Sequence, residues 1–156
     1  MEASVTYKIF DLPSHVLVIH LVVVGIPVAA LATTAIAVRP QWRTGKVGLA
    51  VVILDVLAVL GTYIARITGE AFFKNAPGLQ TLKQVIDHKN LGMTLIWYML
   101  GLLVSAILLV LAEKYERPPL TTVFAILATA AAVAAVVQTV RVGDAGARAT
   151  WSGFIR

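Results

Sequence analysis

Long apolar runs separated by short polar stretches dominate the pattern of this chain. Four runs cover residues 14–38, 47–68, 88–112 and 120–141. Each is long enough to cross, as a helix, a hydrocarbon core about 30 Å thick. Pro and Gly stand beside charged residues in the breaks between runs, and both residue types end helices. The pattern therefore predicts a single four-span transmembrane domain, residues 1–156, folded as an all-α integral membrane four-helix bundle in up-down-up-down order.

The connection between the second and third runs, residues 71–87, is the longest and has a pattern of its own. Apolar residues recur there at near-helical spacing, with polar residues between them: Leu79, Leu82, Val85 and Ile86. This spacing predicts a short amphipathic helix lying on the membrane surface between spans two and three. Gly69, directly after the second run, is predicted to end that helix.

Composition supports the membrane class. Hydrophobic residues make up 59% of the chain and charged residues 13%, whereas a soluble domain carries roughly a quarter charged residues. The net charge of +5 comes from Lys and Arg residues scattered among the loops, so the expected counterpart is the lipid bilayer, through its anionic headgroups, with no nucleic acid. The chain has no cysteine, which excludes disulfides and thiolate metal sites.

Enzyme signatures are missing from the chain. It contains no Gly-rich phosphate loop, no GxSxG elbow, no HExxH and no CxxC. We therefore do not expect the protein to be an enzyme on its own. The two short loops hold five positive charges, which by the positive-inside rule favours a cytoplasmic position for these loops and places both termini outside: Arg39, Arg43, Lys46, Lys114 and Arg117.

Polar residues that loop solvation does not explain gather at one predicted membrane level. In an up-down-up-down bundle, the starts of spans one and three share a side with the ends of spans two and four. All three histidines of the chain lie in this set: His15, His20, Arg66, Glu70, Asp87, His88, Gln138, Arg141 and Asp144.

The histidines suggest a cofactor. His15 and His20 lie about 140° apart on a helical wheel, so only one of them can follow a narrow inward stripe, and we expect that one to be His20. Neutral imidazole binds metals, and haem iron takes an axial ligand on each side. One hypothesis is therefore a haem b or metal site with His20 and His88 as ligands. Arg66 and Arg141 would then face the haem propionates.

Two other roles for this polar cluster stay open. Histidine titrates close to neutral pH, so His15 and His20 could exchange protons with neighbouring acids: Glu70, Asp87 and Asp144. In the structural interpretation, His20 donates to a carbonyl or to Glu70 and the arginines reach toward phosphates.

Asp55 stands near the middle of span two. An ionised carboxylate without a partner there would cost at least about 3 kcal/mol, so the group is expected to be neutral, paired or in a polar pocket. Thr33, Thr34 and Ser105 lie at matching depth. Asp55 is predicted to lock helices together, and proton transfer is the alternative.

A faint internal repeat is visible. His15 lies 51 residues before Arg66, and His88 lies 53 residues before Arg141. Each Arg is followed by a Gly and an acid. Two duplicated hairpins, or chance, would explain this pattern equally well.

Four segments carry a resemblance to a known family: Leu12-Pro13-Ser14-His15 through His20, Gly69-Glu70, Asp87 through Gly92, and Gly143 through Trp151. Together they resemble, over nearly the whole chain, the bacterial four-helix membrane family catalogued as domain of unknown function 2231. His15, His20 and His88 fall on that family's histidine positions. The chain departs from the usual pattern at Val16, where relatives have Pro, at Leu21-Val22, where they have Phe-Pro, and at Asp144, where they often have a fourth His.

The resemblance implies a multi-pass protein of the bacterial cytoplasmic membrane. Some relatives are joined to Rieske-type iron–sulfur domains, which implies an association with electron transport. We therefore expect an accessory or cofactor-binding protein, in a larger respiratory membrane complex or a homo-oligomer, with its polar cluster on the outer side. The alternatives are a non-enzymatic structural scaffold and a component of proton or small-solute transport.

Overall fold

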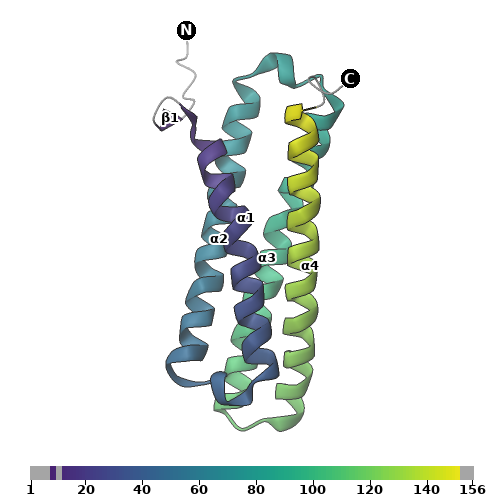
Figure 1. Ribbon diagram of the computed structural model, residues 1–156. Coiled ribbons are helices and arrows are strands. Elements are labelled where there is room, and N and C mark those ends of the chain that lie inside the picture. Colours follow the sequence, from purple (N-terminus) through teal and green to yellow (C-terminus); the bar gives the residue numbers. More distant parts are fainter. Residues whose placement is uncertain (1–7, 10–11, 152–156) are drawn as a thin grey trace.

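Four long helices form an up-down-up-down bundle (Figure 1). The computed structural model describes residues 8–9 and 12–151. The helices are α1 (Ser14–Val38), α2 (Gly45–Lys74), α3 (Lys83–Lys114) and α4 (Pro118–Trp151). Two-residue strands β1 (Lys8–Ile9) and β2 (Leu12–Pro13) pair antiparallel just before α1. All four helices are long and apolar enough to cross a membrane, which confirms the predicted fold class.

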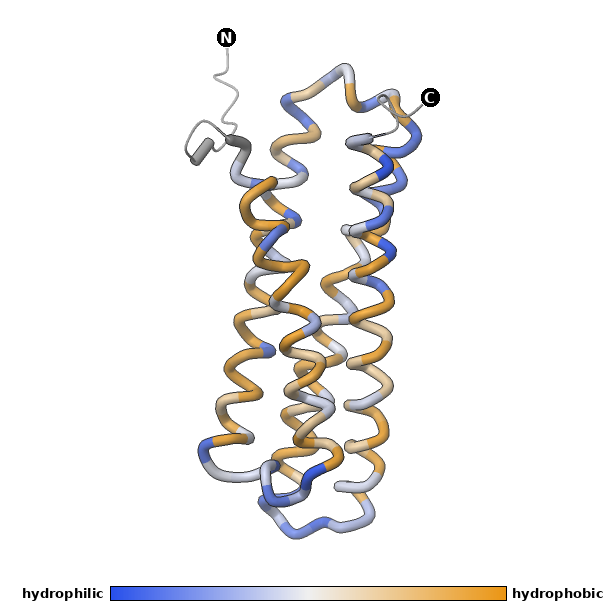
Figure 2. Tube along the Cα trace, in the orientation of Figure 1, coloured by the Kyte–Doolittle hydropathy of each residue, from blue (hydrophilic) through white to orange (hydrophobic). Residues whose placement is uncertain are grey.

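Each helix packs on its neighbour in sequence and α1 closes the ring against α4, so α1 and α3 lie on a diagonal. The buried surfaces combine small residues of α1 and α4 with larger side chains of α3, as in Ala29, Ala135 and Met99. Large apolar side chains such as Leu21 and Ile126 are exposed instead, and Figure 2 shows hydrophobic residues all along the helices. This distribution suits a bundle surrounded by lipid, where small residues let helix backbones approach closely.

The connections differ from those expected. α1 has the bounds of the first predicted run, but α2 continues through Gly69 to Lys74, so the predicted stop at Gly69 is wrong. The separate amphipathic helix expected in residues 71–87 does not form either. α2 and α3 extend into this segment, and only the 3₁₀ turn η2 (Pro77–Leu79) lies between them. Gln80 Nε2 donates to the carbonyls of Phe73 (3.0 Å) and Lys74 (3.3 Å), which satisfies the end of the longer α2.

Asp55 joins α1 to α2 inside the bundle. Its side chain is fully buried, and Thr33 Oγ1 donates to its Oδ2 at 2.8 Å. The other two residues expected at this depth bond within their own helices, Thr34 to Ala30 and Ser105 to Leu102. The helix-locking contact therefore exists, and it involves one of the three hydroxyls.

The end of the bundle that holds the two short loops is closed by one arginine. Arg43 Nε and Nη2 donate to the carbonyls of Ile36 (3.0 Å) and Ala37 (2.7 Å), and Nη1 donates to Glu113 Oε2 at 3.0 Å. We call this the arginine end. The guanidinium satisfies carbonyls near the end of α1 and ties the 3₁₀ turn η1 (Pro40–Trp42) and the loop after it to α3. Gly48 packs against the carbonyl of Arg43.

Candidate functional site

His15 and His88 meet at the opposite end of the bundle. His15 is the second residue of α1 and His88 lies in the second turn of α3, and the up-down order brings both to the same end. Their ring centroids are 6.4 Å apart, with the planes inclined by 65°. We call this the histidine end. It brings together two of the three histidines that the sequence placed at this level.

Both imidazoles are fixed in the same way. His15 Nδ1 lies 3.1 Å from the carbonyl oxygen of Ala65 on α2, and His88 Nδ1 lies 3.0 Å from that of Val142 on α4. A carbonyl oxygen only accepts hydrogen bonds, so Nδ1 carries the hydrogen and donates it. In the neutral ring, Nε2 then keeps its lone pair. Neither Nε2 has a hydrogen-bond partner among the described residues.

A glycine makes room for each ring. A Cβ added at Gly69 would lie 2.8 Å from Cε1 of His15, and one added at Gly146 would lie 3.0 Å from Cε1 of His88. Each glycine comes four residues, one helical turn, after the residue whose carbonyl accepts the histidine bond. The two hairpins, α1 with α2 and α3 with α4, therefore hold their histidines with the same parts.

This arrangement changes which residues of the two hairpins correspond to each other in the internal repeat. Matching the accepting carbonyls and the glycines sets Arg66 opposite Gly143, and Arg141 opposite Ile64. The two arginines that the sequence pattern paired are therefore not equivalent in the structure. The glycine and the carbonyl one turn before it are the repeated features.

His20 lies outside this pair. Its ring is exposed, and Nδ1 donates to the carbonyl of Val16 one turn earlier, at 2.6 Å. The expectation that His20 is the inward histidine is therefore wrong. His15 takes that place because Gly69 leaves space beside it, and the angle between the two positions turns His20 away.

The two arginines have different surroundings. Arg141 Nη1 donates to Gln138 Oε1 at 3.3 Å. Gln138 is buried, and its Nε2 donates to Leu91 O (3.1 Å) and Thr94 Oγ1 (2.9 Å) of α3. Arg66 directly follows Ala65, and its side chain forms no hydrogen bond within the described part of the chain. Among the described residues, no hydrogen bond joins either arginine to the histidine pair.

The acids expected in the cluster pair locally instead. Each forms an ion pair with a basic residue four positions away on its own helix: Glu70 with Lys74 at 3.0 Å, Asp87 with Lys83 at 2.8 Å, and Asp144 with Arg148 at 2.9 Å. Within residues 8–9 and 12–151, no group of three or more His, Asp or Glu side chains could hold a metal ion. The nine-residue polar set is therefore divided into a central histidine pair, three acids in surface ion pairs, Gln138 bonded to Arg141, and His20 and Arg66, which join none of these groups.

Sequence reasoning missed the residues that hold the pair. The sequence predicts a helix stop at Gly69 and gives Ala65, Val142 and Gly146 no role in holding the histidines. Ala65 and Val142 act through backbone oxygens, which no side-chain pattern reveals. The only available signal was a glycine inside each of two long helices, at the level of a histidine on the preceding helix.

The chain belongs to a family of membrane proteins. A family model described as "Predicted membrane protein (DUF2231)" matches residues 11–156. This confirms the family that the histidine and glycine segments indicated, and it agrees with four helices able to cross a bilayer. No curated protein and no solved structure matches the chain.

Proposed function

We propose that the protein is a membrane redox module that holds a haem b between His15 and His88. The observation that carries this proposal is the pair itself: two imidazoles side by side, each oriented through Nδ1, each with an open Nε2. Histidines that bind metals typically donate their other ring N–H to a carbonyl or carboxylate, which fixes the tautomer and raises the basicity of the ligand.

The number of histidines favours haem over a bare metal ion. A tetrahedral metal needs about four ligands, three of them from protein even at a catalytic site, and the described residues offer two. A porphyrin supplies its own four nitrogens, so two axial histidines complete the iron. If the two Nε2 atoms faced each other across one iron, two metal–nitrogen bonds of about 2 Å each, together with the ring dimensions, would put the imidazole centroids about 6 Å apart. The observed 6.4 Å supports this assignment.

The bundle residues would have defined tasks at such a site. The carbonyls of Ala65 and Val142 hold the imidazoles in the ligating tautomer, and Gly69 and Gly146 leave room for the rings. Bound haem would supply one-electron chemistry. Of the two arginines, Arg66 remains the proposed partner of the propionates, because Arg141 is held by Gln138.

We place this module in the bacterial cytoplasmic membrane, as an accessory subunit of a respiratory or other electron-transfer assembly. The positive charge of the short loops supports an orientation with the histidine end and both termini outside. Membership of a membrane-protein family supports the location in a bilayer.

The test is an absorption spectrum of the detergent-purified protein expressed with haem supply. We expect a Soret band that His15→Ala or His88→Ala abolishes. His20→Ala is the matched control and keeps the band, because His20 bonds within its own helix. A colourless preparation that takes up no added haemin overturns the proposal, and so does a band that only His20→Ala removes.

A structural scaffold is the second candidate. The same histidine bonds join α1 to α2 and α3 to α4 without any cofactor, which favours this role. It predicts a colourless protein that His15→Ala destabilises and that co-purifies with a larger membrane complex in mild detergent. Proton or solute transport has less support, because Glu70 is paired with Lys74 on its own helix, and Asp55, which bonds to Thr33 through Oδ2 alone, lies away from the pair. Unchanged flux in liposomes for Asp55→Ala and Glu70→Ala would dismiss transport.

A further inference from the structure

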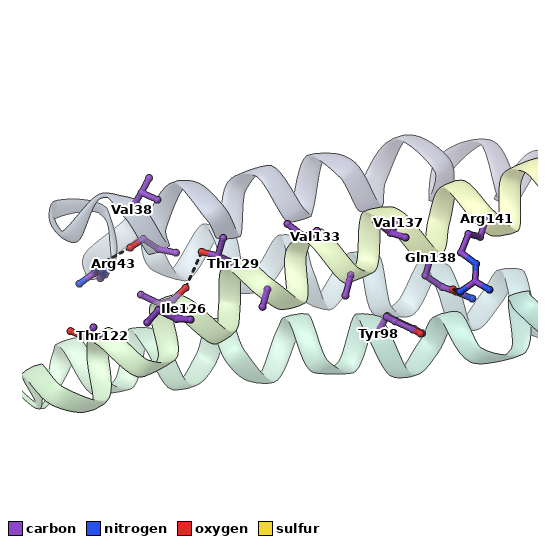
Figure 3. A pocket seen from close by; sticks show the side chains of 14 residues that line it. Val38, Arg43, Tyr98, Thr122, Ile126, Thr129, Val133, Val137, Gln138 and Arg141 are labelled. Atoms are coloured by element: carbon purple, nitrogen blue, oxygen red, sulfur yellow. Dashed lines mark hydrogen bonds between the residues drawn. The ribbon is translucent and has the colours of Figure 1, made fainter.

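A long groove follows the outer face of α4. Its volume is about 860 Å³, and it runs from Thr122 to Arg141 with Tyr98 of α3 and the end of α1 at its sides (Figure 3). At 1.5 Å per residue, this stretch of α4 is about 28 Å long, close to the hydrocarbon thickness of about 30 Å. The lining between its ends is apolar or small, as at Ala130 and Val133. The groove therefore fits an apolar chain longer than one leaflet.

The two ends of the groove differ in what they offer a ligand. At the arginine end, all three donor directions of Arg43 already have partners, one of them the carboxylate of Glu113. At the other end, Arg141 bonds to the neutral Gln138. None of the ion pairs within residues 8–9 and 12–151 includes Arg141. Of the two arginines that line the groove, only Arg141 therefore lacks an anionic partner among the described residues.

Tyr98 adds a second donor at this end. Its hydroxyl has no hydrogen-bond partner among the residues that the structure describes, and Figure 3 shows Tyr98 toward the same end of the groove as Arg141. In lipid there is no water to satisfy such a group. Two donors without acceptors lie next to a long apolar groove. They are complementary to a lipid-like ligand that has acceptor oxygens on its head group and a long apolar tail.

The depth of the two donors in the membrane distinguishes between a charged and a neutral head group. Gln138, which positions Arg141, bonds to Leu91 and Thr94, three and six residues further along α3 than His88. Tyr98 follows four residues after Thr94, so its hydroxyl lies inside the apolar part of the bundle, while Arg141 lies nearer the level of His88. A phosphate carries full charge, which is costly to bring below the interface. A neutral head with carbonyl oxygens can accept from Tyr98 and Arg141 at this depth.

We propose that the groove binds an isoprenoid quinone, with its head between Tyr98 and Arg141 and its tail along α4 toward Thr122. The head would lie near the histidine pair, since Arg141 directly precedes Val142, whose carbonyl holds His88. As the redox partner of that pair, the quinone rests on the function proposed above: its quinol form would give two electrons, one after the other, through ferric haem held by the pair to the proposed electron-transfer assembly, and would release two protons to the aqueous phase. Binding itself does not depend on haem.

The test measures binding of decylubiquinone to the protein in nanodiscs of neutral phosphatidylcholine, through quenching of tryptophan fluorescence; Trp97 directly precedes Tyr98. Tyr98→Phe is expected to raise Kd about 3- to 10-fold, the range for one hydrogen bond. Arg141→Gln should raise Kd by a similar or larger factor, and Ala130→Phe, which fills the groove, by more than about tenfold. Matched controls away from the groove are Tyr63→Phe, Arg148→Gln and Ala50→Phe, and each should leave Kd unchanged.

The same titration is made on the doubly substituted His15→Ala, His88→Ala protein. Unchanged quinone affinity there separates the groove from the histidine site, so either proposal can fail alone. An unaltered Kd in both Tyr98→Phe and Ala130→Phe overturns the quinone site. Displacement of the quinone by phosphatidylglycerol, with Arg141→Gln weakening the lipid and Tyr98→Phe weakening nothing, also overturns it and identifies an anionic phospholipid site.

Discussion

The arginine end and the histidine end use polar groups in opposite ways. Arg43 is nearly buried, with its side chain 12% exposed, and each donating group meets a carbonyl or the carboxylate of Glu113. At the histidine end, each imidazole uses one nitrogen for a carbonyl and keeps the other open.

A polar group in a membrane whose hydrogen bonds are all made is explained by the fold alone. A polar group that is held in one orientation but has a donor or acceptor atom without a partner indicates a ligand. The comparison therefore separates an arginine end that joins the loops to the bundle from a histidine end whose open Nε2 atoms the proposed haem site would use. The substitutions below test this division.

The largest loss of stability is expected from Arg43→Ala. It leaves Glu113 without its cation and two carbonyls without donors, which we expect to lower the free energy of unfolding by about 3 kcal/mol. Thermal unfolding in detergent, followed by circular dichroism, measures this change. Arg39→Ala is the control, since exposed Arg39 only stacks on Trp42 at 4.5 Å. Equal losses in the two variants would contradict a structural role specific to Arg43.

Gly48→Ala should come next, at about 1–3 kcal/mol. The added methyl would collide with the backbone carbonyl of Arg43, whose carbon would lie 2.7 Å away, and backbone cannot move aside without shifting the loop. Gly101→Ala, which meets nothing within 4 Å, should cost nothing. The same unfolding experiment measures the stability of both variants. Equal stability of Gly48→Ala and Gly101→Ala would contradict close packing of Gly48 against the carbonyl of Arg43.

A smaller loss of stability, about 1 kcal/mol, is expected for Gly69→Ala and for Gly146→Ala. Here the obstacle is a histidine ring, which can rotate away and thereby lose its carbonyl bond. Haem uptake should fall more than stability, and to a similar degree in both variants, because the two hairpins share one arrangement. Gly92→Ala, with nothing within 4 Å, is the control for both readouts. A strong loss of haem uptake in only one of the two variants would contradict the equivalence of the two hairpins.

The smallest effect is expected from His20→Ala, within about 0.5 kcal/mol of the unmodified protein. Its ring is exposed and bonds to its own helix. A loss of stability as large as that of His15→Ala, measured in the same unfolding experiment, would move His20 into the set of structural residues.

The sequence predicted the class of fold because hydrophobic length is a local property. Four apolar runs had to form helices in lipid, and even the first helix kept its predicted bounds, Ser14 to Val38. Helix ends were predicted less well. Gly69 looked like a stop, whereas glycine is tolerated inside a helix when a neighbour needs its space, as the ring of His15 does.

At the candidate site, too, the sequence predicted some features and the tertiary structure decided others. Counting along helices was enough to bring His15 and His88 to one end, because up-down order and a rise of 1.5 Å per residue determine depth. It could not decide which of His15 and His20 points inward, since that depends on the rotation of α1 against α2. Only the tertiary structure decided this, by setting Gly69 and the carbonyl of Ala65 beside His15 and turning His20 outward.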